Sequence, residues 1–509
     1  MAREPTRARK AAKKPAGRGR TKAPKTAAAK SKATKADGGK AQAESIRIRM
    51  YRQGLGDCLL LGIPGEDRTF WMLVDCGLIL GTTDAARKIE EIVADVAKVT
   101  GGHLDVLAVT HQHWDHISGF ALAREAFEAL RIDAVWMAWT EDPKDELATR
   151  LRRERDEKLQ KLAAFVGGLG ARGGSTADRI SAVLNFFNLG FGAAGPSTAD
   201  ALAAVRGFAG GKEPIYWRPG DAPLVPPQAP AVRIYALGPP QSEKALKKTF
   251  AKSEVYHVDT IDTPLFGAVL GAFDTASVAD AFCPFDRGVG TMLAPLLEPA
   301  AAGADPDVLR EFLDRHYLDA DRSLGKEAGW RRIDDAWLGA AAEFALALDS
   351  ATNNTSLVLA IEIVDTGAVI LLAADAQVGN WLSWHEQTWE VGGRKVTAAD
   401  LLGRTVFYKV GHHGSHNATL QKKGLEMMLS PDLVAFIPVD RAMARQKGWN
   451  EMPLPGLVNA LQAKTKNRLL QADQPFAAAA NAESGAFAAA LEQTSLYFEH
   501  RVPLRRSSG

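Results

Sequence analysis

Hydrophobic and polar positions change their period along the chain, and the period predicts which segments are strands and which are helices. Ile46–Met50 alternates apolar and polar residues, as a half-buried strand does. Asp84–Val99 gathers its apolar residues on one face, which predicts an amphipathic helix that Gly101 and Gly102 end. Three further strands are expected at Cys58–Ile63, Phe70–Val74 and Leu104–Val109, and a second helix is expected to begin near Ser118. This succession of strands and helices predicts an α/β fold.

The middle of the chain is less regular. Pro143–Val166 is charged and helical in pattern, Gly167–Gly211 is rich in Ala and Gly, and residues 241–350 look mainly helical. We expect insertions at about 140–215 and 241–350 that form a cap or lid. Strands are expected again at Val232–Leu237, Ser356–Ile363, Ala368–Ala373, Thr405–Val410, Leu433–Ile437 and Ser495–Phe498, with a helix at Pro455–Lys464.

Charge divides the chain into two parts, although its formal net charge is only +2. Residues 1–40 contain 14 Lys or Arg against Glu4 and Asp37, and residues 1–44 contain no Leu, Val, Phe, Trp or Tyr. Such a segment cannot bury enough apolar surface to offset the entropy of ordering. We therefore expect a disordered basic arm over residues 1–44 and a mildly acidic folded body over residues 45–509.

The cysteines and the apolar runs indicate the cellular compartment in which the protein is expected. The three cysteines, Cys58, Cys76 and Cys283, form no CxxC pair, which favours a reducing cytosol over a disulfide framework. No apolar run approaches the roughly 18 residues of a membrane span, and the N-terminus lacks the apolar stretch of a secretory signal. The expected location is cytoplasmic, without a membrane partner. The pattern carries no signal for an oligomeric state.

Six of the eleven histidines lie in two short segments, and each segment follows a buried strand. In the first segment, His111 and His113 are two positions apart, so in an extended chain both can point to one ion. Asp115 and His116 can then face a second ion after the chain turns. Three imidazoles and a carboxylate suit Zn²⁺, or alternatively Mn²⁺ or Fe. A polar loop with satisfied hydrogen bonds is the alternative interpretation, and three histidines with an aspartate in six residues disfavour it.

The order of these motifs resembles the metallo-β-lactamase fold superfamily. Thr110–His116 matches its HxHxDH signature, Leu73–Gly77 resembles the strand and turn whose Asp75 supports the site, and Leu371–Asp375 resembles the strand that ends in a bridging aspartate. Val410–Ser415 resembles the strand before the final histidine ligand. The resemblance implies an αββα sandwich with helical insertions and a pair of metal ions, and it covers about residues 45–140 and 350–440.

Within that superfamily, four segments resemble the hydrolase domain of ComEC-type competence proteins. These segments are Gly54–Leu60, Leu237–Pro240, Asn353–Leu357 and His412–Ser415. The likeness implies action on phosphodiesters, with DNA as the expected substrate. His113 and Ala374 depart from the pattern, which has Asp and Gly there, and the ComEC membrane channel is absent.

Two ligand assignments stay open in the sequence. His412 and His413 are adjacent and point to opposite faces of an extended chain; we expect His412 to be the ligand and His413 to pack or to touch substrate. Many superfamily members use a further histidine before the bridging aspartate, and His257 and His316 are the candidates in that interval. An ordinary turn explains His416, Ser415 and Asn417 as well as substrate binding does.

These residues lead to one hypothesis and two alternatives. The hypothesis is a metal-dependent phosphodiesterase or nuclease, in which His111, His113, Asp115, His116, Asp375 and His412 hold two ions. Asp375 would bridge the ions, Asp115 would orient the attacking water and Asp75 would steady the ligands. The first alternative is hydrolysis of a small ester, thioester or lactone, because a fold does not fix a substrate. The second is a DNA- or protein-binding scaffold with a structural or decayed metal site.

The basic arm also has more than one interpretation. A Lys- and Ala-rich segment of this kind resembles linker-histone tails and would bind nucleic acid phosphates without sequence preference. A solubilising extension is an equally good interpretation, and an organellar transit peptide is a third.

Overall fold

The computed structural model describes residues 45–169, 174–189, 195–249, 251, 253–254, 307–318, 336–479 and 482–505. All of these residues belong to one compact unit, residues 44–509. The expected basic arm over 1–44 and His257 lie outside the described residues. Among the residues described, no helix is long and apolar enough to cross a membrane.

Two sheets form the centre of the described unit. The first has eight strands in the order β15-β16-β1-β2-β3-β4-β5-β6, and the second has six in the order β14-β13-β12-β9-β8-β7. The strands of the first are β1 Ser45–Tyr51, β2 Leu59–Pro64, β3 Thr69–Val74, β4 His103–Val109, β5 Arg131–Ala138, β6 Ile215–Trp217, β15 Glu492–Gln493 and β16 Tyr497–Pro503. Those of the second are β7 Val232–Gly238, β8 Val358–Ile363, β9 Val369–Leu372, β12 Thr405–Lys409, β13 Val434–Ile437 and β14 Leu469–Gln471, and β10 Thr388–Val391 pairs with β11 Arg394–Thr397 as a separate hairpin.

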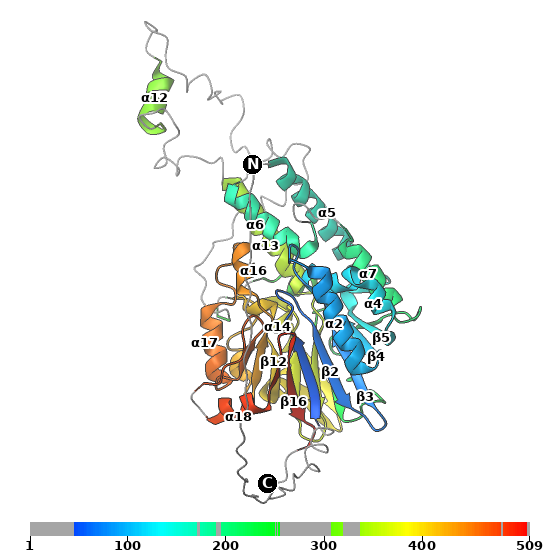
Figure 1. The fold of residues 1–509 in the computed structure, drawn as a ribbon. Coiled ribbons are helices and arrows are strands. Elements are labelled where there is room, and N and C mark those ends of the chain that lie inside the picture. Colours follow the sequence, from blue (N-terminus) through cyan, green and yellow to red (C-terminus); the bar gives the residue numbers. More distant parts are fainter. Residues whose placement is uncertain are drawn as a thin grey trace, which may run out of the picture. The chain divides into compact units, whose positions relative to one another are not determined.

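Alternation along the strands places one core between the sheets and one on each outer face. In β12, Phe407 belongs to the cluster between the sheets, while its neighbour Tyr408 belongs to the outer cluster. The outer face of the first sheet packs on α2 Ala85–Thr100, α3 Trp114–Leu122, α4 Arg124–Glu128 and α7 Thr198–Gly207. That of the second packs on α14 Val378–Trp384, α15 Ala398–Gly403, α16 Arg441–Gln446 and α17 Pro455–Lys464. Figure 1 shows the strands between α2 on one side and α17 on the other, which is the αββα arrangement expected from the sequence.

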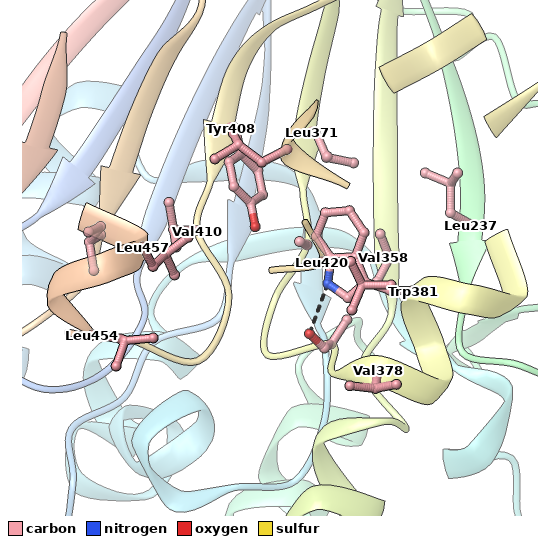
Figure 2. Packing of buried hydrophobic residues seen from close by; sticks show 14 of the residues in the cluster. Leu237, Val358, Leu371, Val378, Trp381, Tyr408, Val410, Leu420, Leu454 and Leu457 are labelled. Carbon is pink, nitrogen blue, oxygen red and sulfur yellow. Dashed lines mark hydrogen bonds between the residues drawn. The ribbon is translucent and has the colours of Figure 1, made fainter. Parts of the chain in front are cut away.

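Trp381 anchors that second helical layer. Its side chain is fully buried, and its indole nitrogen donates to the carbonyl oxygens of Ala376 at 3.1 Å and Ala418 at 3.0 Å. Figure 2 shows the ring of Trp381 among Val358, Leu420 and other apolar side chains of this layer. The anchor holds the segment after β9 against the segment after β12, and these two segments carry Asp375 and His412–Ser415.

The regions expected to be insertions are helical where the structure describes them. The first contains α5 Glu146–Leu169, α6 Gly174–Leu184 and the short helix η3 Asn185–Phe187, and the second contains α8 Glu243–Leu246, α12 Val308–His316 and α13 Ala336–Asn353. The remaining helices are α18 Ala482–Ala490 and the short helices η1 Trp139–Glu141, η6 His412–Gly414 and η7 Leu425–Met427. Helix α13 packs against α5 and α6, so the two insertions meet.

Two sequence expectations need correction. The second helix begins at Trp114 and not near Ser118, because the chain turns directly after His113, which has extended backbone angles and caps α3. Strands β5, β6 and β14 and the β10–β11 hairpin were not expected. Strands β6 and β14 have three residues each, and the two strands of the hairpin have four, which is too short for a clear period. Strand β5 is longer but does not strictly alternate buried and exposed residues. Tertiary pairing therefore decides that these segments form strands.

Candidate metal centre

The segment after β4 brings two histidines together. The chain stays extended from Thr110 to His113, so the two rings leave the same side of the backbone. Nε2 of His111 lies 3.1 Å from Nδ1 of His113, and both side chains are buried. Two nitrogen ligands of one tetrahedral zinc ion lie about 3.3 Å apart. The spacing of the two ring nitrogens therefore fits a shared ion.

Asp75 fixes the ring of His116. It stands directly after β3 with a positive φ of 55°. One carboxylate oxygen accepts the Thr110 backbone N–H at 2.8 Å, and the other lies 2.7 Å from Nδ1 of His116 and accepts the Thr110 hydroxyl at 2.7 Å. With Nδ1 engaged in this way, Nε2 of His116 points into the centre, as ligating histidines backed by a carboxylate do.

Asp375 stands just after β9 and presents its two oxygens differently. Oδ1 accepts from the His412 backbone N–H at 2.9 Å and from Nζ of Lys409 at 3.1 Å. Oδ2 is buried without a hydrogen-bond partner, 3.1 Å from Nε2 of His116 and 3.9 Å from Nε2 of His413. One oxygen is thus held by the protein, and the other is left for a cation.

His413 reaches the same place from the segment after β12. Its ring donates from Nδ1 to the Pro438 carbonyl at 2.6 Å, so Nε2 is the ring nitrogen that faces the centre, 2.8 Å from Oδ2 of Asp115. Asp115, His116, Asp375 and His413 each offer an atom within 4.8 Å of the other three. This set, which we call the four-residue group, joins three segments of the chain, of which the first and the last are almost three hundred positions apart.

The structure brings His413, and not the expected His412, into the four-residue group. The backbone has positive φ at both residues, 38° and 53°, so the two adjacent rings do not follow the alternation of an extended strand. Nδ1 of His412 lies 2.8 Å from the Ser415 hydroxyl and 3.1 Å from the Gln377 amide nitrogen. Its Nε2 faces Asp349 at 3.9 Å.

The other candidates for substrate binding have different surroundings. Ser415 donates to Asn417 at 3.1 Å, and the Asn417 amide donates to Gln377 at 2.7 Å, so both side chains support the ring of His412. His416 is exposed and lies outside the group. His316 lies on α12 and is not part of any ligand cluster among the described residues.

The chemistry of the centre fits divalent cations. Five carboxyl groups are buried around these histidines, and one ammonium, that of Lys409, pairs with two of them, Asp57 and Asp375; the others are Asp75, Asp115 and Asp349. Such an excess of buried negative charge is costly unless protons or cations offset it. Several buried polar atoms of the centre have no hydrogen bond, among them His113 Nε2, Asp115 Oδ1, His116 Nε2, Asp349 Oδ1, Asp375 Oδ2 and His412 Nε2. Nitrogen and carboxylate donors in this number suit zinc.

The electrostatics of the group follow from this crowding. Burial opposes charge on Asp115, but His116 and His413 hold its pKa below the ordinary value. Burial likewise opposes protonation of His116, yet Asp375, Asp57 and Asp115 raise its pKa well above 6.5. By contrast, burial lowers the pKa of His113 to about 3, which keeps that imidazole neutral. Bound cations would take the place of the protons on His116 and His413.

Glycines allow the supporting backbone to approach the first motif. A Cβ on Gly77 would lie 2.4 Å from the Asp115 carbonyl, and one on Gly56, where φ is 151°, would lie 2.6 Å from the same oxygen. The Asp57 N–H donates to that oxygen at 3.0 Å. The turn Gly54–Asp57 therefore packs directly against the backbone of Asp115 and lies next to His116.

Three residues near the centre were missed by the sequence analysis. Asp57 lies in the ComEC-like segment Gly54–Leu60 without being a candidate ligand in the sequence, and its carboxylate forms a buried ion pair with Lys409. Lys409 itself ends a buried apolar strand next to the histidine motif, a position where a lysine needs a charged partner. Asp349 stands in an apolar helix four residues before Asn353, and only the fold reveals that it faces His113 and His412.

Aromatic side chains from the first insertion lie over the histidines. The rings of Phe186 and Phe187 are centred 5.4 Å and 4.7 Å from that of His113. Phe186 stacks on Trp449 at 4.8 Å. We call Phe186, Phe187 and Trp449 the aromatic cap. It lies against a centre in which the four-residue group has no solvent exposure.

Comparison with known families agrees with this architecture. Residues 51–177, which run from the end of β1 through HxHxDH into α6, match the family model of the metallo-beta-lactamase superfamily. This domain has the metallo-β-lactamase fold. Proteins of that superfamily are mostly metal-dependent hydrolases, and the metallo-β-lactamase domain described here has buried histidines and aspartates that could hold metal.

No curated protein and no solved structure is significantly similar to the chain. The assignment of the metallo-β-lactamase domain therefore depends on the family match and on the two-sheet architecture. The second half of the centre, with Asp375 and His413, lies beyond the matched residues and is placed by the fold.

Proposed function

We propose that the chain is a metal-dependent hydrolase that cleaves phosphodiester bonds. The observation that carries this proposal is the convergence of Asp115, His116, Asp375 and His413 from both halves of the sandwich. Next to that group, Nε2 of His111 and Nδ1 of His113 offer a second pair of ligand atoms. Together the six side chains would hold two ions.

Divalent cations bound there would activate a water for attack and stabilise the charge that develops on the phosphoryl oxygens. The protein holds the ligand atoms in position. Lys409 and the His412 backbone N–H hold Oδ1 of Asp375, so that Oδ2 stays turned toward the histidines. Asp115 keeps Oδ1 free of hydrogen bonds and would orient the attacking water.

The choice of a phosphodiester is supported by the ComEC-like segments, which surround the centre. Gly54–Asp57 contacts the backbone of Asp115. Asn354 is tied to Asn380 of α14 by two hydrogen bonds of 3.0 Å, and a Cβ on Gly238 would collide with Asn380. These segments thus pack together around the centre. Nucleic acid is the substrate class that the resemblance implies.

The aromatic cap favours a second candidate. Because the four-residue group is fully buried under Phe186 and its neighbours, a small ester, thioester or lactone would reach it more readily than a duplex would. Enlarging the entrance with Phe186→Ala would then raise kcat/KM for bulky esters more than for small ones. Equal changes for both substrates would argue against a cap that selects by size.

The deciding experiment combines metal analysis with a substrate panel. Purified protein would be loaded with Zn²⁺, Mn²⁺ or Fe²⁺ and incubated with single- and double-stranded DNA, RNA, a chromogenic phosphodiester and a chromogenic ester. We expect phosphodiester cleavage that Asp375→Ala reduces by at least 10²-fold. Asp105→Asn is the matched control, because this buried aspartate pairs with Arg68 away from the four-residue group.

Ester cleavage without phosphodiester cleavage would select the second candidate. Less than one bound metal per chain with no activity on any substrate would favour the scaffold hypothesis, in which the arm over 1–44 binds nucleic acid by itself.

A further inference from the structure

Asp349, near the end of α13, lies between the two histidine motifs. Oδ1 is 3.7 Å from Nε2 of His113, and Oδ2 is 3.9 Å from Nε2 of His412. The carboxyl group is buried, and burial, followed by the nearby Asp115 and Asp375, raises its pKa well above the ordinary value. Neither Oδ1 nor the two ring nitrogens have a hydrogen-bond partner. Among the residues that the structure describes, these two histidines are its only ion-pairing neighbours.

The ring protons of the histidines in the first motif can be assigned step by step, starting from Asp75. The Thr110 hydroxyl donates to Oδ2 of Asp75, so its oxygen accepts the proton from Nδ1 of His111, 3.1 Å away. Nε2 of His111 therefore carries a lone pair, and this atom faces Nδ1 of His113. If both nitrogens are to bind one cation, Nδ1 of His113 must also be bare, and its ring proton must sit on Nε2.

We infer that Asp349 is the positioning residue that accepts this Nε2–H proton and so keeps Nδ1 of His113 available to a cation. The inference rests on the proposed metal-dependent function. A ligating histidine usually donates its second ring N–H to a carboxylate or a carbonyl, and Asp349 is the carboxylate on that side of the ring. A shift of about 1 Å would bring the pair to hydrogen-bond distance.

The surroundings of Asp349 suit a fixed acceptor. The Asn353 amide, one helical turn further along α13, donates to Oδ2 at 3.1 Å and anchors the carboxylate. Phe187 packs edge-on against the ring of His113, and both side chains are buried. Since α13 belongs to the second insertion, that insertion contributes to the metal centre and does more than cover it.

The test measures binding of Zn²⁺ alone, by competition with a chromophoric chelator, in the wild type, Asp349→Asn, Asp349→Glu and the control Asp105→Asn. We expect Asp349→Asn to weaken one of the two zinc sites by 10- to 100-fold and to leave the other within about threefold. Asp349→Glu should restore part of the loss. Visible spectra of the Co²⁺-loaded protein should change for one ion only.

Two zinc sites of unchanged affinity in Asp349→Asn would overturn the inference, and so would an equal loss at both sites. If the variant does not fold, long-range ¹⁵N–¹H spectra of the zinc-loaded wild type decide: a proton on Nδ1 of His113 contradicts the assignment. Failure of the proposed function looks different, because the wild type itself would then bind fewer than two ions.

Discussion

Nε2 of His413 lies 2.8 Å from Oδ2 of Asp115, although 298 positions separate the two residues. Asp115 lies in the first turn of α3 on the first sheet, and His413 follows β12 of the second. The contact is possible because the two sheets meet at this edge, where the Leu357 N–H at the start of β8 donates to the Thr110 carbonyl at 2.9 Å. Each half of the sandwich thus supplies half of the centre.

The first prediction distinguishes the two adjacent histidines. His413→Ala removes a member of the four-residue group and should lower the metal content by about one ion per chain. His412→Ala should leave the content unchanged, because that ring contacts Gln377, Ser415 and Asp349. Mass spectrometric metal analysis of dialysed protein measures both. Loss of an ion in His412→Ala alone would restore the original expectation from the sequence.

The second prediction concerns the buried ammonium of Lys409. Lys409→Met leaves Asp57 and Asp375 without their cation, and we expect the free energy of unfolding to fall by about 3–5 kcal/mol. Urea denaturation of the metal-free protein measures the change. Lys144→Met is the control, because Lys144 and its partner Glu213 are both largely exposed and water screens their attraction.

A double variant sharpens that prediction. Asp57→Asn in the Lys409→Met background removes one of the two stranded charges and should recover part of the lost stability. The effect of Asp57→Asn on the free energy of unfolding is measured in the wild type and in Lys409→Met. If it is the same destabilisation in both backgrounds, the two side chains are not coupled.

The third prediction is a pH dependence away from the metal centre. His500 packs between Phe407 and Phe487, and burial, followed by Arg468, lowers its pKa to about 4. The unfolded chain takes up this proton near pH 6.5 and the folded chain only near pH 4. The contribution of His500 to the free energy of unfolding is therefore fully present above pH 6.5. It decreases as the pH falls toward 4, by at most about 1.4 kcal/mol per pH unit.

His500→Leu should flatten the pH profile over that window relative to the wild type. Urea unfolding at several pH values gives the comparison, and His385→Leu, at the end of α14, controls for loss of a histidine elsewhere. Parallel profiles for the wild type and His500→Leu would contradict the assignment.

The fourth prediction addresses the basic arm over residues 1–44, which we propose binds nucleic acid. If about six of its 14 cationic side chains contact phosphates, DNA affinity should fall roughly 10³-fold between 50 and 200 mM salt. Deletion of the arm should remove this binding, whereas Asp375→Ala should keep it. Salt-dependent DNA binding that survives the deletion would assign it to the folded body.

The sequence could predict much of this fold because its strongest signals are local. The strand before His111, the HxHxDH spacing and the strand before Asp375 are each recognisable within a dozen residues. The structure places them where the edges of the two sheets meet. The pairing of His413 with Asp115 could not be predicted, because two positive φ values reverse the usual alternation at the end of β12. Asp349 was missed for a different reason: a single acidic residue in an apolar helix has no motif, and only tertiary packing gives it neighbours.

The pairing of β1 with β16 also governs when the first sheet can be finished during synthesis. Ser45 lies opposite Pro503, so β1 has only one neighbour until almost the whole described chain has left the ribosome. Until then its other edge presents unpaired N–H and C=O groups to any strand of the nascent polypeptide. Chaperone supply and translation speed should therefore govern the soluble yield of this protein, and a short C-terminal truncation should harm that yield far more than its length suggests.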